Sequence, residues 1–189
     1  MESHNPFYIE NRTSEVNHLF ITGRKFGSTF RFNQEQSYTN FLYSMDGVMY
    51  EMKMFQGSML SKTGIEIAPH GRIYIAGHWG GPCSKEIQYT FMCSNDFAVG
   101  GDISWLIDAK PAPGFSLTTE EPFEICCDVV DDLSDKPNAL SYLFFTADNL
   151  VDASELVLPA TKLGDYSYMR MFAECKKLKT PPALPATQL

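Results

Sequence analysis

A six-residue phrase that occurs twice near the end of the chain constrains the fold more than any other feature. Residues 158–163 read LPATKL and residues 184–189 read LPATQL, so five of the six letters agree at an offset of 26 residues. A period of this length predicts repeated structural units. One such unit cannot bury its own apolar face, so it must stack on a neighbour. The first copy then needs the upstream part of the chain as its neighbour, and the last copy leaves Leu184 and Leu189 uncovered.

The residues between the two phrases indicate how one unit is built. In the second copy, apolar residues lie three or four positions apart, which is the spacing of one face of a helix. Each copy then continues into an extended segment that ends in Leu-Pro-Ala-Thr, where proline prevents a helix from continuing. We therefore expect a short helix, a bend and a short strand in each unit. The residues that define the repeat are Leu150, Leu158, Pro159, Leu163, Met171, Phe172, Cys175, Leu178, Leu184, Pro185 and Leu189.

The part of the chain before the repeat has the pattern of short β-strands. Apolar and polar residues alternate in VNHLFITG (16–23), and Asp46-Gly47 is a hairpin turn signal between two aromatic-rich segments. The segment IEIAPHGRIYI (65–75) has the same layout and predicts a second hairpin. The segment GGDISWLIDA (100–109) predicts a strand that leads into a short helix. These signals favour an N-terminal antiparallel β-sandwich.

The predicted architecture is mainly β with α/β repeats. Residues 1–112 form the β-sandwich domain, and residues 113–189 form a linker plus about two leucine-rich-repeat-like units. The composition is 44% hydrophobic, which is enough for a packed core. The net charge of −8 argues against nucleic acid as a partner, since phosphate backbones require a cationic surface. The sequence lacks an apolar run long enough to cross a membrane and shows no signal peptide.

No sequence motif predicts catalysis, a metal or a cofactor. The five cysteines have no CxxC spacing and are interpreted as small buried hydrophobic residues. The acidic segment 120–135 lacks the order of a calcium loop and is interpreted as a solvated linker. Two aromatic residues, Trp79 and Tyr74, are candidate ligand contacts, because aromatic side chains on a β-sandwich can bind sugars. Packing is the expected role of Trp105.

The segment 149–189 resembles the BspA-type leucine-rich-repeat surface proteins of gut and oral bacteria. Their repeats read close to C-Y-x-x-M-F-x-x-C-x-x-L-x-x-x-P-x-L-P-A-T-x-L, and residues from Tyr168 to Leu189 follow that pattern. The first copy departs from it, because Ala147 or Asp148 stands where cysteine is expected. The upstream phrases PFYIEN, FLYSMDGVMYEM and FAVGGDISWLI resemble the β domain that often precedes such repeats.

The resemblance implies a non-catalytic binding or structural protein. Two settings are open: a bacteriophage virion component (decoration, fibre or host attachment), or an adhesin on the bacterial cell surface. The implied partner is a protein or a surface glycan, and a homo-oligomer or virion assembly is a further expectation. The alternative is a carbohydrate-binding module that uses exposed aromatic side chains. An enzyme of the sandwich type stays open as a class but has no support in the sequence.

Overall fold

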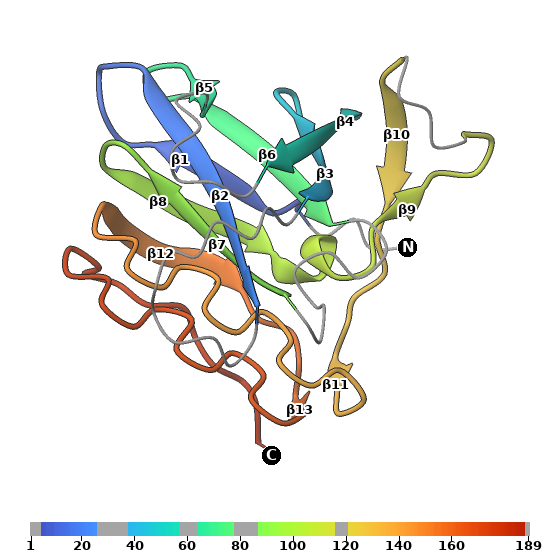
Figure 1. Cartoon of the computed structure of the whole chain (residues 1–189). Helices are drawn as coiled ribbons and strands as arrows, with labels where there is room; N and C mark the ends of the chain where they lie inside the picture. Colours follow the sequence, from blue (N-terminus) through green and yellow to red (C-terminus); the bar gives the residue numbers. More distant parts are fainter. Residues whose placement is uncertain (1–4, 26–37, 57–63, 78–86, 116–120, 188–189) are drawn as a thin grey trace.

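The computed structural model describes residues 5–25, 38–56, 64–77, 87–115 and 121–187. It is mainly β, as predicted, and contains one mixed eight-stranded sheet and one antiparallel three-stranded sheet (Figure 1). The large sheet has the order β12 (Leu150–Val157), β8 (Phe97–Asp102), β1 (Tyr8–Asn11), β6 (Arg72–Gly77), β3 (Tyr38–Ser44), β4 (Met49–Gln56), β10 (Phe123–Cys126) and β9 (Lys110–Pro111). The small sheet has the order β5 (Ile65–Ile67), β2 (Asn17–Lys25) and β7 (Ile87–Cys93).

The two sheets enclose an aromatic core. Strand residues alternate between the two faces of a sheet, so Phe7, which directly precedes β1, and Ile9 of β1 point into the core, while Tyr8 points to the opposite face. Across the interface, the Phe91 ring of β7 lies 6.2 Å from the ring of Phe7 and 5.5 Å from the ring of Phe41 on β3. Contacts of this kind add to the burial of apolar area, which is the main stabilising term.

One predicted hairpin is confirmed and the other is wrong. The Asp46-Gly47 turn joins β3 to β4, and the Asp46 carboxylate accepts hydrogen bonds from the backbone N–H groups of Val48 and Met49. By contrast, the turn at residues 68–71 joins β5 to β6, which lie in different sheets. The isoleucines of both strands are buried in the one core, so this turn carries the chain from one sheet to the other.

The short helix predicted after β8 is present as the 3-10 helix η2 (Ile103–Leu106). The Asp102 carboxylate caps its start by accepting a hydrogen bond from the Ser104 N–H at 2.8 Å. Trp105 is buried, and its ring stacks on the Tyr50 ring at 6.2 Å. The role of Trp105 is therefore packing, as expected.

The C-terminal part contains two stacked units, a first unit (residues 138–163) and a second unit (residues 166–187). Backbone N–H groups of the first unit donate to carbonyl oxygens of the second: Tyr142 to Met169 at 2.9 Å, Phe144 to Met171 at 2.9 Å and Thr146 to Ala173 at 3.0 Å. Side chains 28 positions apart also meet, since the Phe144 and Phe172 rings stack at 5.5 Å. The offset is therefore 28 residues here and shortens to 26 at the Leu-Pro-Ala-Thr phrase.

The helix predicted in each unit is wrong, because the described part of the chain contains no α-helix. Both units consist of consecutive turns in which left-handed residues recur at the same spacing. A residue with a left-handed backbone conformation, that is a positive φ, prevents an α-helix from forming and leaves N–H groups that can donate to the neighbouring unit. The apolar residues keep a spacing of three and four because, in these tight turns as in a helix, residues three or four positions apart lie on the same side of the unit. The left-handed residues are Asn138, Leu140, Tyr142 and Thr146 in the first unit, and Tyr166, Tyr168, Arg170 and Glu174 in the second.

The first unit packs on the upstream strands. The Phe91 N–H of β7 donates to the Leu143 carbonyl at 2.7 Å, and the buried Gln88 amide donates to the Ser141 hydroxyl at 3.1 Å. Strand β12 pairs in parallel with β8, while β11 (Asp132–Leu133) pairs with β13 (Lys162–Leu163). Segments on both sides of residue 112 therefore belong to the same large sheet. The division into domains 1–112 and 113–189 stays a prediction. Two stacked units are described, not a closed solenoid.

The repeated phrase supplies a matched pair of leucines that tests this packing. Leu158 is 4% exposed and its counterpart Leu184 is 61% exposed. We expect Leu158→Ala to lower the free energy of unfolding by about 2–5 kcal/mol, because it leaves a cavity. Leu184→Ala should change it by less than about 0.5 kcal/mol. Urea denaturation of both variants measures the difference, and equal effects would contradict the stacking described here.

A second pair of variants distinguishes turns from a helix at Glu174, which is exposed and has a φ of 63°. Glycine adopts a left-handed conformation without the steric penalty of a Cβ atom. Glu174→Gly should therefore be about 1 kcal/mol more stable than Glu174→Ala. In a helix the order would be reversed by about the same amount. Thermal or urea unfolding of the two variants gives the sign.

Candidate functional site

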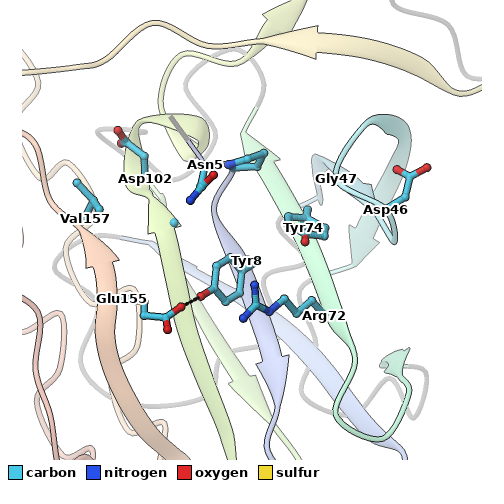
Figure 2. Close-up of a pocket in the computed structure, with 11 residues that line it drawn as sticks. Asn5, Tyr8, Asp46, Gly47, Arg72, Tyr74, Asp102, Glu155 and Val157 are labelled. Atoms are coloured by element: carbon cyan, nitrogen blue, oxygen red, sulfur yellow. Dashed lines mark hydrogen bonds between the residues drawn. The ribbon is translucent and has the colours of Figure 1, made fainter. Parts of the chain in front are cut away.

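A cavity of about 560 Å³ opens on the face of the large sheet opposite the core. Four strands and the β3–β4 turn supply its walls, and Figure 2 shows their side chains converging from β1, β6, β8 and β12. The residues that line it are Asn5, Pro6, Tyr8, Asp46, Gly47, Arg72, Tyr74, Gly101, Asp102, Glu155 and Val157.

The floor of the cavity is a row of residues that the strand register brings side by side. Tyr8 of β1 lies opposite Gly100 of β8 and Tyr74 of β6, and Gly100 lies opposite Glu155 of β12. The Tyr8 hydroxyl donates a hydrogen bond to the Glu155 carboxylate across β8 (Figure 2). A Cβ atom on Gly100 would overlap that hydroxyl, so glycine is required for Tyr8 to reach Glu155.

An arginine covers the face of the central tyrosine. The Arg72 guanidinium lies 4.1 Å from the centroid of the Tyr8 ring, within the range of a cation–π contact. The Arg72 Nε donates to the Glu10 carboxylate at 2.7 Å, and Arg12 forms an ion pair with the same carboxylate at 2.8 Å. Because Glu10 holds Arg72 from one side and Tyr8 supports it from below, the guanidinium is fixed at the edge of the cavity.

One rim is formed by the β3–β4 turn and Tyr74. Hydrogen bonds from the Val48 N–H, the Ser44 hydroxyl and the Met49 N–H lower the pKa of Asp46, so its carboxylate is ionised at neutral pH. Gly47 has a φ of 77° and lies directly over the Tyr74 ring, where a Cβ atom would come within 3.2 Å. Glycine therefore serves both the turn and the close approach to the half-buried Tyr74.

The opposite rim combines backbone and polar groups. Gly101 has a φ of 78° and lies against the Pro6 carbonyl so closely that no side chain fits. Asp102 is 4% exposed and directs one carboxylate oxygen to η2. Figure 2 places Asn5 and Val157 on either side of Asp102, and Val157 is 51% exposed.

The arrangement offers hydrogen-bond donors, acceptors and apolar surface within one cavity. Burial, and then the hydrogen bond to Glu155, raise the pKa of Tyr8, so the hydroxyl stays protonated at neutral pH and continues to donate. The described residues that line the cavity include three carboxylates and one guanidinium, so their charges have an acidic balance. Such a site can bind a small polar group.

The structure gives the sequence-predicted residues different positions. Tyr74 lines the cavity, while Trp79 and Leu189 lie outside the described residues. The repeat-defining residues that the structure describes do not line the cavity. Those that are buried are Leu150, Leu158, Leu163 and Met171; those that are half-buried are Pro159, Phe172, Cys175 and Leu178; those that are exposed are Leu184 and Pro185.

Sequence reasoning missed Tyr8, Arg72 and Glu155. Their only local signal is the pair Gly100-Gly101 inside a strand phrase, because glycine in a strand marks a close approach of other groups. That signal indicates a crowded position but does not name the residue that fills it.

Within the described ranges, no group of three or more histidine, cysteine, aspartate or glutamate side chains is placed to hold a metal ion. In the same ranges no helix has the length and apolar character needed to cross a membrane. The chain matches no protein-family model, no curated protein and no solved structure.

The contact at the floor of the cavity can be measured by a double-mutant cycle. We expect Tyr8→Phe and Glu155→Ala to show a coupling energy of about 1 kcal/mol or more in urea denaturation, because a partly buried charge-assisted hydrogen bond is lost. The matched control is the exposed Tyr43–Glu51 pair on β3 and β4, joined at 2.8 Å in the same sheet. Its coupling should stay below about 0.5 kcal/mol. Equal couplings would contradict the central position of Tyr8.

Proposed function

We propose that the chain is a non-catalytic binding protein displayed on a surface, either on a bacteriophage virion or on the envelope of a bacterial cell. Its second unit belongs to a leucine-rich-repeat array of the BspA type, and the β domain supports that array. Display in many copies would let weak individual contacts add up to firm attachment.

The observation that carries this proposal is the stacking of the second unit on the first at a nearly constant offset. Besides the backbone hydrogen bonds, Lys176 forms an ion pair with Asp148 at 3.4 Å, and Lys177 donates to Asn149 at 3.0 Å. Both pairs join residues 28 positions apart. Repetition of contacts at one offset is the property that lets an array present a continuous surface.

The identities of the stacked residues support the same assignment. Leu143 and Met171 are both buried, and Ala147 of the first unit takes the position of Cys175 in the second. The repeat pattern quoted above expects Met and Cys at these two positions. The first unit has alanine in place of the cysteine, and Ala147 is 1% exposed.

Immunogold electron microscopy tests the proposal. Antibodies raised against the purified chain are applied to cells of the source organism and to phage particles purified from an induced culture. We expect gold label on the particles or on the cell envelope, and the labelled structure decides between the two settings. Label confined to the cytoplasm, with clean particles and envelopes, would overturn the proposal.

A further inference from the structure

We infer that the cavity between β1, β6, β8 and β12 binds a neutral saccharide. This inference rests on the proposed function, since a displayed binding protein needs a ligand that other surfaces carry. The candidate ligand is a neutral sugar ring or a short neutral glycan, which a cavity of about 560 Å³ accommodates.

The polar groups of the cavity favour a ligand that both donates and accepts hydrogen bonds. Glu155 and Asp46 supply carboxylate acceptors, while Arg72 and the Asn5 amide supply donors. A sugar hydroxyl does both, because it carries one proton and two lone pairs. Neighbouring hydroxyls on one ring can therefore pair with carboxylates and with the guanidinium at the same time.

The apolar groups suit the C–H face of a sugar ring. Tyr74 is half-buried in the cavity wall, and the exposed Val157 stands on the opposite side. Pro6 adds a third apolar surface. An open cavity that combines apolar side chains with fixed polar groups matches a molecule that has C–H faces and hydroxyl edges.

The charges of the cavity disfavour charged ligands. An acidic sugar would meet the carboxylates of Asp46, Asp102 and Glu155, and among the described lining residues one guanidinium, that of Arg72, compensates. A cationic peptide side chain would be attracted by the carboxylates but would meet the Arg72 guanidinium at the edge of the same cavity. Because both signs of charge are present within one small volume, a neutral polar ligand meets the least electrostatic repulsion.

The polar side chains are held in place before a ligand arrives. Glu155 accepts from Tyr8, Arg72 is fixed by Glu10, and Asp46 is fixed by the turn that it caps. Side chains that are already ordered lose little conformational entropy on binding. This is the property that a binding site for a weakly interacting neutral ligand requires.

The test begins with the full chain on an array of neutral, sialylated, sulfated and amino-sugar glycans, alongside a basic peptide. We expect binding to neutral glycans. The best neutral glycan is then titrated by calorimetry at low and high salt, where its affinity should stay constant because no net charge is neutralised. Binding of only acidic glycans, only amino sugars or only the basic peptide would overturn the inference, and so would no binding at all.

Two cavity variants and two matched controls locate the site. Tyr74→Leu and Glu155→Gln should each lower the affinity for the neutral glycan by about tenfold. The first variant removes the aromatic ring, and the second removes one carboxylate oxygen that accepts hydrogen bonds. Tyr166→Leu and Glu66→Gln change exposed residues of the same types outside the cavity and should stay within about twofold. If Tyr74→Leu fails to fold by circular dichroism, Glu155→Gln decides alone, since Glu155 is exposed.

The outcomes separate this inference from the proposed function. Unchanged affinity in the cavity variants would place the glycan elsewhere and refute the site, even if the protein labels particles or envelopes. Neutral glycan binding by a chain found only in the cytoplasm would refute surface display and leave the site standing.

Discussion

The structure depends on one junction, where Phe91 of β7 joins the small sheet, the large sheet and the first unit. Its ring packs on Phe7 and Phe41 of the large sheet and lies 6.3 Å from Phe144 of the first unit. Its N–H donates to the Leu143 carbonyl, so the backbone of the first unit is tied to β7 at the same point. Apolar burial and hydrogen bonding act together here, because the Phe91 ring packs in the core while its N–H is paired with the first unit.

From this junction the aromatic packing continues outward. Phe144 stacks on Phe172, so the second unit is built on the first as the first is built on β7. The left-handed residues make this possible, although each costs about 1–2 kcal/mol in a residue with a Cβ atom. A helix would use its N–H groups internally, whereas these turns donate part of them to the next unit. Repeated hydrogen bonds between units offset the backbone strain within each.

The sequence predicts those parts of the fold that depend on residues close together in the chain, and not those that depend on contacts between distant residues. Alternation and the Asp46-Gly47 turn are local, and the strands and the first hairpin are where they predict. The spacing of Met171, Phe172 and Cys175 correctly marks one inward face, but a helix and a series of tight turns give the same spacing. Only the unit-to-unit hydrogen bonds decide between them, and these join residues 27 positions apart.

The candidate site could not be predicted for a related reason. Tyr8 and Glu155 are 147 residues apart, and they meet because β12 joins the sheet in parallel beside β8. Local patterns give strands but not the order of strands in a sheet, so the row across β12, β8, β1 and β6 is not readable from sequence. The sequence predicts Tyr74 as a candidate because it is an aromatic residue on a strand, but its neighbours in the row follow only from the strand register.

The same strand connects the cavity with the repeat. On β12, Glu155 and Val157 face the cavity, while Ala153 and Leu156 are buried. The Ala153 N–H donates to the Thr180 carbonyl at 2.9 Å, which ties the strand to the second unit. The first unit is therefore not an appendage to a separate β domain, because its strand β12 is part of the large sheet. The first unit supplies one wall of the cavity through β12, and the second unit is hydrogen-bonded to that strand. The candidate ligand site and the repeat are therefore structurally connected.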